Sequence, residues 1–303
     1  MFTLQYKKGW LITTAIARSL IGIPVGDRIP TIQEYVDLFE TSRGVIQNAL
    51  QILQDEGAVM LEKRGKSGTF ITALNQSVLF RLADILSITG SMGIPYSDKP
   101  YGLATGVSIC MSNCPAPFNF AFVSGSGHRL NALRRGDYDF VIVSKSTANH
   151  LAGDITLEIA VTLNNCHYSE PYVFCSRGAD ITEPRDGMTI AVDPDAIDQF
   201  QITQRLCEGK DITFIQRTLI TCRALFLEHK ADGVVFFEDE WTKGEEIWTH
   251  PISPSLELFE NTPVIVIQKS EQAIGKILRI YLRNRDIASI QKQVMSKEIE
   301  PQF

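Results

Sequence analysis

The chain has 303 residues, of which 44% are hydrophobic and 21% charged, as in an ordinary globular protein. Its formal net charge of −6 argues against a protein that is uniformly covered with nucleic-acid-binding cations. No apolar run reaches the roughly 20 residues that span a bilayer, and the length favours two domains over one.

Targeting signals are not evident in the sequence. Residues 1–10 contain two lysines but no apolar segment that ends in a small-residue cleavage site, so we expect no signal peptide. The six cysteines are widely spaced and form no Cys-x-x-Cys pair, which favours reduced thiols over a disulfide framework. We therefore expect a cytoplasmic protein that does not bind membranes.

Charge is unevenly distributed along the chain. Residues 1–72 contain eight Lys/Arg and seven Asp/Glu and carry +1, whereas residues 73–303 carry −7. The basic residues Lys63, Arg64 and Lys66 stand close together. Because local charge determines attraction to phosphate, the acidic total does not exclude a nucleic-acid-binding N-terminal part.

Three helices are predicted in the first 55 residues. Apolar spacing predicts a first helix over about 10–20 and a second helix after Pro30. A third is predicted over 43–55, with Thr41 and Ser42 as candidate N-caps. Gly57 is expected to end it.

The third helix has the pattern of a DNA recognition helix. Arg43 can donate two hydrogen bonds to guanine in the major groove, and Gln47, one turn later, can pair with adenine. Gly44 leaves room for a close approach of the backbone. The alternative is a solvated surface helix, which is the usual reading of an isolated amphipathic helix.

A hairpin with a basic tip follows this helix. Residues 59–62 and 69–71 are predicted strands, and the tip between them is rich in glycine and cations. Such a tip can approach a phosphate or the minor groove, although a basic hairpin alone is usually only a turn. Helix, cap and hairpin in this order favour DNA binding.

This stretch resembles the winged helix-turn-helix of GntR-family transcription regulators. The matching segments are Gly26-Asp27-Arg28-Ile29-Pro30, Ser42-Arg43, Ala49-Leu50, Leu53, Glu56-Gly57 and Gly68-Thr69-Phe70-Ile71. The resemblance implies a homodimer on double-stranded DNA with a short inverted repeat. The residues it implies as DNA contacts, with Arg64 added from the basic tip, are Thr31, Gln33, Ser42, Arg43, Gly44, Gln47, Arg64, Gly65 and Lys66.

Two positions depart from the family pattern. Gln33 and Gln47 stand where family members commonly have arginine. Each missing cation removes a candidate phosphate or guanine contact, and two lost contacts lower the salt dependence by about two units of log–log slope. Weaker binding or a different DNA sequence is expected.

Strand-like and helix-like runs alternate over the remaining 230 or so residues. The predicted strands are 84–88, 118–123, 140–143, 155–163, 172–175, 189–192, 233–237 and 264–267. The predicted helices are 101–112, 128–135, 196–208, 221–230 and 272–283. This alternation predicts an α/β fold with largely parallel sheets, and the late strand 264–267 can return to the first group.

This region resembles the type 2 periplasmic-binding-protein-like effector domains that LysR-type regulators also contain. The segments that carry the resemblance are residues 101–106, 133–141 and 168–173. A winged helix joined to such a domain is most similar to the YhfZ group of transcription regulators. We therefore predict a winged helix-turn-helix domain over 1–73 and a two-lobed α/β effector-binding domain over 74–303.

Small molecules bind such folds in the cleft between lobes, at loops that follow strands. The candidate ligand contacts in these loops are Ser91, Met92, Ser126, Ser144, Asp193, Arg217 and Glu238. Hydroxyls and amides at helix starts, with Arg217 or Lys145, favour an anionic or zwitterionic metabolite. Turn formation remains an alternative role for the serines, and helix capping for Asp193.

Enzymatic signals are weak. The loop 124–128 lacks the Gly-Lys-Ser/Thr ending of a phosphate loop, and the Cys166-His167 pair has no second pair to complete a metal site. No nucleophile elbow is present. We expect a ligand-responsive transcription regulator that is not an enzyme and needs no cofactor or metal. The alternatives are an enzyme of the two-lobed fold with a regulatory winged helix, and a DNA-binding protein whose second domain only dimerises.

Overall fold

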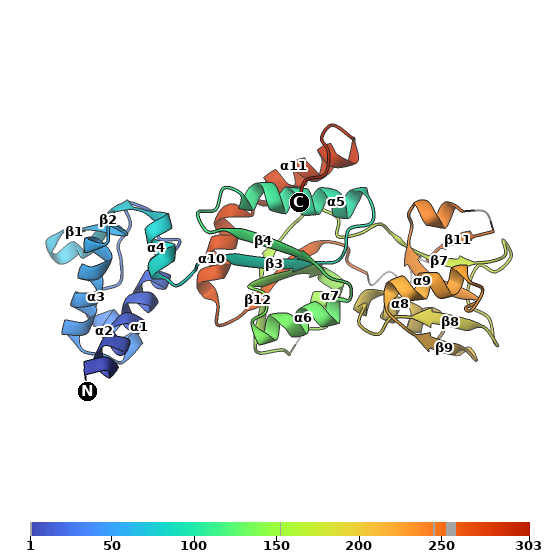
Figure 1. Ribbon diagram of the computed structural model, residues 1–303, viewed down its shortest axis with the longest axis horizontal. Helices are drawn as coiled ribbons and strands as arrows, with labels where there is room; N and C mark the ends of the chain where they lie inside the picture. Colours follow the sequence, from blue (N-terminus) through green and yellow to red (C-terminus); the bar gives the residue numbers. More distant parts are fainter. Residues whose placement is uncertain (1, 152, 245, 253–258) are drawn as a thin grey trace. The chain divides into compact units, whose positions relative to one another are not determined.

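The computed structural model describes residues 2–151, 153–244, 246–252 and 259–303 (Figure 1). Contacts divide the chain into two compact units. The first unit contains Met1–Ile88, Ser112–Asn119 and Gln272–Tyr281, and the second contains the rest. Among the described residues, no helix combines the length and the apolar character that crossing a membrane requires.

The first unit contains the predicted winged helix-turn-helix. Its elements are α1 (Phe2–Leu20), α2 (Ile32–Phe39), α3 (Arg43–Asp55), β1 (Val59–Lys63), the 3-10 turn η1 (Gly65–Ser67), β2 (Thr69–Leu74) and α4 (Gln76–Leu82). Strands β1 and β2 pair antiparallel, and a bridge between Arg28 and Phe70 adds a third short segment. The predicted third helix and hairpin are confirmed, and the first helix begins earlier than predicted.

Helix starts in this unit differ in how they are capped. Ser42 occupies the N-cap of α3 with an extended backbone, but its hydroxyl caps no amide, so the predicted side-chain cap is wrong. Thr31 instead caps α2, because its Oγ1 accepts from the Glu34 amide while the Glu34 carboxylate accepts from the Thr31 amide. Gly57 ends α3 with φ +74°, a left-handed conformation that glycine adopts without strain.

Helix α10 (Gln272–Tyr281) belongs to this unit although it comes late in the chain. Lys276 Nζ donates to the carbonyl of Ser19 at 3.3 Å, and the Lys276 side chain lies against Gly22. The Tyr281 hydroxyl donates to Gln76. These contacts attach α10 to α1 and to α4.

Two five-stranded sheets, each the centre of one lobe, belong to the second unit apart from Ile88, Phe118 and Asn119, which belong to the first. The sheet of lobe one has the order β4-β3-β5-β12-β6, and the sheet of lobe two has the order β11-β7-β10-β8-β9. The strands of lobe one are β3 (Ile88–Met92), β4 (Phe118–Phe122), β5 (Phe140–Ser144), β6 (Leu157–Thr162) and β12 (Pro263–Gln268). The strands of lobe two are β7 (Tyr172–Ser176), β8 (Thr189–Val192), β9 (Thr213–Gln216), β10 (Gly233–Phe237) and β11 (Trp248–Pro251).

The chain crosses between the lobes twice. It leaves lobe one after β6, completes lobe two, and returns as β12, which pairs antiparallel with β5 and β6. The predicted return of the late strand is therefore confirmed. The sheets are mixed rather than largely parallel, because β12 in lobe one and β7 and β11 in lobe two pair antiparallel.

One predicted strand is wrong. The run 84–88 mostly follows the end of α4 as a turn and an irregular segment, and β3 begins only at Ile88. Asp84 itself has φ +57°, which no regular strand contains. The other seven predicted strands and all five predicted C-terminal helices are present.

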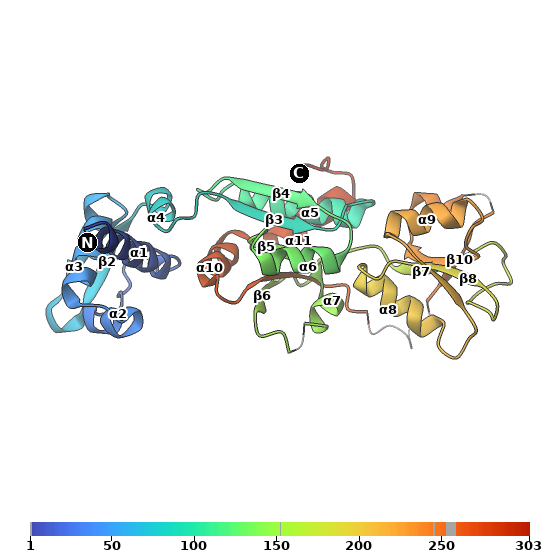
Figure 2. The same ribbon diagram turned by 60° about the horizontal axis from the view of Figure 1, so that its bottom comes forward.

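Helices cover both faces of the lobe-two sheet, as Figure 2 shows for α8 (Ile197–Leu206) and α9 (Leu219–Leu227). Alternate residues of β7 and β10 point to opposite faces. Val173 and Val234 pack with Cys222 of α9, whereas Phe174 and Val235 pack with Ile202 of α8. Both faces of this sheet are therefore buried.

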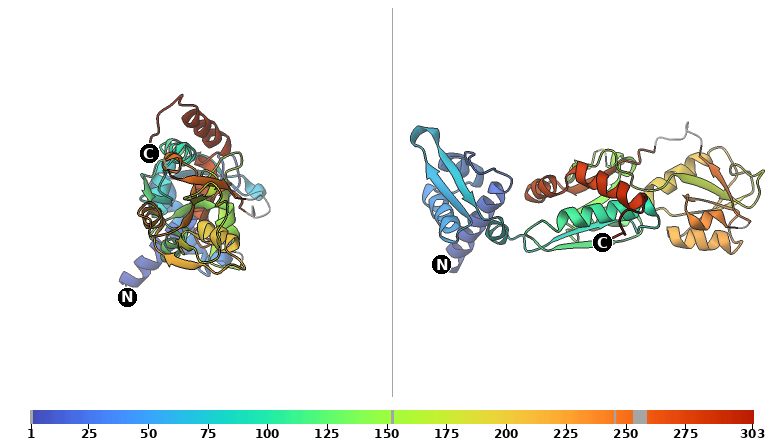
Figure 3. Two further views of the ribbon diagram at one scale, coloured as in Figure 1. Left: turned by 90° about the vertical axis from the view of Figure 1, so that its right-hand side faces the viewer. Right: turned by 90° about the horizontal axis from the view of Figure 1, so that it is seen from above.

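Lobe one has a helix pair formed by α5 (Asp98–Met111) and α11 (Asn284–Met295), which lie side by side (Figure 3). A Cβ at Gly102 would meet the Gln291 backbone at 2.9 Å, and one at Gly106 would meet Ile287 at 3.0 Å. Two glycines one turn apart thus let the helices approach closely. The shorter helices α6 (Ser126–Arg135) and α7 (Lys145–Asn149) pack with β5 and β12.

Candidate functional site

The first candidate surface is the exposed face of α3. Ile46, Ala49 and Leu53 are buried in the unit's core, which turns the opposite side of the helix outward. Arg43, Gly44 and Gln47 are exposed on that side. Arg43 has no hydrogen bond or ion pair to any described residue, so its guanidinium is available to a ligand.

This face carries no negative charge over its first three turns. The only acidic residue of α3 is Asp55 at its end, where it accepts from Gln51 at 2.7 Å. A DNA backbone approaching the start of the helix would therefore meet no carboxylate of α3 itself. Absence of repulsion and a free arginine suit the major groove.

The tip of the hairpin forms the second part of this surface. Lys63, Gly65 and Lys66 are exposed, and Gly65 (φ +53°) and Gly68 (φ +104°) turn the chain around η1. Arg64 is ion-paired to Glu62 at 2.7 Å and lies over the Phe70 ring. Of the tip cations, the two lysines have no partner among the described residues, whereas Arg64 is partly neutralised.

The remaining predicted DNA contacts lie close to this face but are engaged locally. Thr31 forms the capping box of α2, and Gln33 donates to Asp37 at 2.8 Å. Both side chains are exposed, as is Ser42. Their role as DNA contacts stays a prediction.

The second candidate site is a cavity that both lobes line. It contains about 650 Å³ of space not filled by protein atoms, part of which is open to solvent. Its lining residues include Met92, Ser126 and Arg129 from lobe one and Asp198, Leu219 and Phe237 from lobe two.

Arg129 is the cation of this cavity. It lies in the first turns of α6 and is only 2% exposed. Its Nη1 donates to the Val123 carbonyl at 2.6 Å and its Nη2 donates to the Tyr168 hydroxyl at 2.8 Å. Its Nε is buried and has no hydrogen-bond partner among the described residues. A buried donor left without a partner costs about 1–3 kcal/mol, more when charged.

Asp198 is the buried carboxylate of the cavity. Its Oδ2 accepts from the Ser144 hydroxyl at 2.6 Å and its Oδ1 accepts from the Thr147 hydroxyl at 2.9 Å. Burial raises the pKa of Asp198, and the two hydroxyls oppose that shift. Because Asp198 belongs to α8 and both donors to lobe one, these bonds join the lobes.

The start of α6 makes a second junction between the lobes. The Gly127 amide donates to the Asp195 carbonyl at 2.9 Å, and the Ile197 amide donates to the Ser126 hydroxyl at 3.2 Å. His128 Nε2 lies 3.0 Å from a carboxylate oxygen of Asp195. These contacts bring the lobes together beside the cavity.

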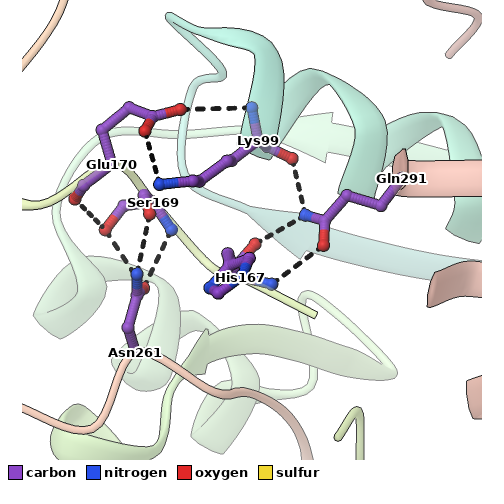
Figure 4. A network of polar contacts seen from close by, with 6 residues as sticks. All are labelled: Lys99, His167, Ser169, Glu170, Asn261 and Gln291. Atoms are coloured by element: carbon purple, nitrogen blue, oxygen red, sulfur yellow. Dashed lines mark hydrogen bonds and ion pairs between the residues drawn. The ribbon is translucent and has the colours of Figure 1, made fainter. Parts of the chain in front are cut away.

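The first crossing segment is held in place by a network of side-chain amides (Figure 4). The buried Gln291 donates from Nε2 to the carbonyls of Lys99 and His167, at 2.8 and 2.7 Å, and its Oε1 accepts from the His167 amide. Asn261, on the second crossing segment, donates to the Ser169 carbonyl at 2.7 Å and accepts from the Ser169 amide at 3.0 Å. The two crossing segments are thereby hydrogen-bonded to each other.

The predicted ligand contacts are only partly brought together. Met92 and Ser126 line the cavity. Ser91 is buried beside Met92 with an unpartnered hydroxyl, and Ser144 bonds Asp198. Ser91 and Ser144 are not among the residues that line the cavity.

Three further predicted contacts lie outside the lining. Asp193 is buried and accepts from the amides of Asp195 and Leu219, which matches the capping alternative. Arg217 is exposed and donates to the adjacent Gln216 carbonyl, and Glu238 is exposed. Their role in binding stays a prediction.

Arg129 and Asp198 were not predicted from the sequence as site residues. Each lies within a predicted helix, where a charged residue is normally solvated. The position of Arg129 two residues after the Ser-Gly-Ser-Gly loop was the one available signal, because ligands of such folds bind at loops that follow strands.

Comparison with known families gives two matches. The family described as YhfZ C-terminal domain matches residues 75–303, and the family described as Helix-turn-helix domain matches residues 24–71. The predicted combination of a helix-turn-helix with a two-lobed α/β domain is confirmed.

Individual relatives agree with this assignment. YhfZ of Escherichia coli (strain K12) is 26% identical over 303 residues, which cover 98% of each chain. The crystal structure of YhfZ from Shigella flexneri superposes with a TM-score of 0.60 at 20% identity, covering 75% of this chain and 98% of that one. Immunogenic lipoprotein A from Vibrio vulnificus reaches a TM-score of 0.45 at 11% identity, over 68% of this chain and 99% of its own.

Proposed function

Since the chain belongs to the YhfZ family, defined by its C-terminal domain, we propose that it is a DNA-binding transcription regulator that responds to a small molecule. The observation that carries this proposal is the exposed face of α3, with its unpaired Arg43, beside a hairpin tip with two unpaired lysines. A groove-binding helix and a phosphate-binding tip in one unit are what duplex recognition requires.

We assign the effector to the cavity that the lobes share. A ligand there touches both lobes, so its binding energy depends on how far they are closed. The buried cation Arg129 supports an effector with a negative charge. The GntR-like resemblance of the winged helix supports a homodimer on a short inverted repeat and action in the cytoplasm.

Selection of DNA from a random duplex library by the full-length protein tests the DNA-binding part. Wild-type protein is expected to enrich one inverted-repeat sequence. Arg43→Ala is expected to lose most of this enrichment, because a bidentate base contact contributes about 1–3 kcal/mol of discrimination.

Arg135→Ala is the matched control, since Arg135 is an exposed arginine at the end of α6, paired with Asp137. It should enrich the same sequence as wild type. Absence of any enriched sequence, or equal enrichment by Arg43→Ala, would overturn the proposal.

A further inference from the structure

We infer that the cavity between the lobes binds a monocarboxylate whose remaining part is apolar. The inference rests on the proposed function and names the chemistry of its effector. Three features of the lining carry it: one incompletely paired cation, carboxylates that are already engaged, and apolar walls.

The charge of the ligand follows from Arg129. The guanidinium stays protonated and charged in proteins. No carboxylate of the described residues lies within ion-pair distance of it, and its Nε–H is unpartnered. Arg129 lines the cavity, and a ligand carboxylate beside it would offer the guanidinium a further acceptor through a charge-assisted hydrogen bond, which is about twice as strong as a neutral one.

The two acidic residues of the lining argue against a ligand ammonium group. Glu170 is paired with Lys99 Nζ at 2.7 Å, and both oxygens of Asp198 accept hydroxyl hydrogen bonds. An ammonium group would compete with Lys99 and with these hydroxyls for the carboxylate oxygens and would meet the charge of Arg129. These carboxylates would repel a dianion such as phosphate. Arg129 is the one cation among the described lining residues, so a dianion could also be paired with a single positive charge only.

The walls determine the rest of the ligand. Apolar and aromatic residues of the lining include Met92, Ile94, Pro100, Tyr172, Leu219 and Phe237. Met92, Tyr172 and Leu219 are buried, and the ring centroids of Tyr172 and Phe237 lie 4.7 Å apart. These walls desolvate an apolar group, which contributes about 25 cal/mol per Å² of buried apolar area.

Calorimetric titration of the full-length protein with 3-phenylpropanoate tests the inference. We expect saturable binding. The neutral 3-phenylpropan-1-ol, the small anion acetate and the zwitterion phenylalanine should each bind at least tenfold more weakly. Arg129→Met should weaken 3-phenylpropanoate at least tenfold, whereas Arg135→Met, on the same helix but exposed, should leave it unchanged.

A second variant guards against misfolding of Arg129→Met. Ile94 lines the cavity but is 38% exposed, so Ile94→Trp should fill the mouth without disturbing the buried arginine. It should also weaken binding at least tenfold at an unchanged melting temperature.

The outcomes separate this inference from the proposed function. One outcome is that the alcohol or phenylalanine binds as tightly as 3-phenylpropanoate and that Ile94→Trp blocks this binding. The cavity is then an effector site that does not select a monocarboxylate. The inference then fails while the proposed function stands. Absence of 3-phenylpropanoate binding at millimolar concentration, or binding that neither variant affects, also overturns the inference. DNA selection is measured independently of all these results.

Discussion

Single side chains decide which surfaces of this molecule are open to ligands. Arg43 and Arg129 are both cations near the start of a helix, yet one is exposed and the other is 2% exposed. Arg43 can therefore pair with a macromolecule, whereas Arg129 can be reached only by a ligand that fits inside the cavity.

Base reading by Arg43 predicts a specific pattern of lost discrimination. On the selected duplex, Arg43→Ala should lose preference at one base pair of each half-site while keeping it at the others. Wild-type protein should bind a duplex substituted at that base pair about 5- to 150-fold more weakly than the selected duplex. Arg43→Ala should bind the two duplexes with equal affinity. Fluorescence anisotropy on single-base-pair variants measures this. Equal losses at every position would assign Arg43 to the phosphate backbone instead.

Asp154 predicts a pH-dependent contribution to stability. Hydrogen bonds from the Thr156 hydroxyl, Arg134 and the Thr156 amide lower the pKa of Asp154 to about 2. The folded-state pKa thus lies below the unfolded value, so the contribution is present above about pH 4 and is lost as the pH falls toward 2. Asp154→Asn should lower the free energy of unfolding by about 1 kcal/mol or less at pH 7, since an ion pair near the surface is screened.

Urea unfolding at pH 7 and pH 3 checks this, and the difference between wild type and Asp154→Asn should shrink at pH 3. Asp137→Asn serves as the control, because the Asp137–Arg135 pair is more than half exposed on both sides. A difference that grows on acidification would contradict the assignment.

At the scale of elements, the sequence predicted helices best where the apolar residues recur at helical spacing and a helix-ending residue follows directly. Helix α3 was predicted to its ends because apolar spacing stops where Gly57 supplies a left-handed turn. The run 84–88 was wrongly predicted as a strand because its apolar residues Ile85, Leu86 and Ile88 are typical of one. In the structure most of this run is the connection between the end of α4 and the start of β3. Tertiary packing, not local preference, decides such short segments.

Edge strands and buried charges could not be read from the sequence. Strands β9 and β11 are the two edges of the lobe-two sheet, and β9 is mostly exposed, so it lacks the apolar run of a buried strand. Arg129 and Asp198 stand at helical positions that would be solvated on an isolated lobe. They are buried where two lobes meet, which depends on contacts far apart in the sequence.

The hairpin tip makes a prediction about salt dependence. If Lys66 contacts a phosphate, Lys66→Ala should reduce the slope of log affinity against log salt concentration by about 0.9. The preference among base pairs should not change, because a phosphate contact carries no sequence information. Lys230→Ala, a lysine of lobe two paired with Glu228, is the control and should keep the wild-type slope. An unchanged slope for Lys66→Ala would remove the tip from the DNA interface.

At the scale of the whole molecule, the chain itself connects the cavity to the winged helix. The second crossing segment, held by Asn261, continues into β12, and residues 269–271 join β12 to α10. Helix α10 donates from Lys276 to the carbonyl of Ser19 in α1. If the proposed ligand shifts the crossing segments, the shift would reach α10, an element of the unit that contains the helix-turn-helix, and typical coupling energies are about 1–3 kcal/mol.

The affinity of the full-length protein for its selected duplex, measured with the cavity empty and with 3-phenylpropanoate at 100-fold its Kd, tests this account most directly. We predict a change of about 5- to 150-fold in wild type and none in Arg129→Met. Equal affinities in wild type with the cavity occupied and empty would contradict the proposal that this protein regulates DNA binding through that site.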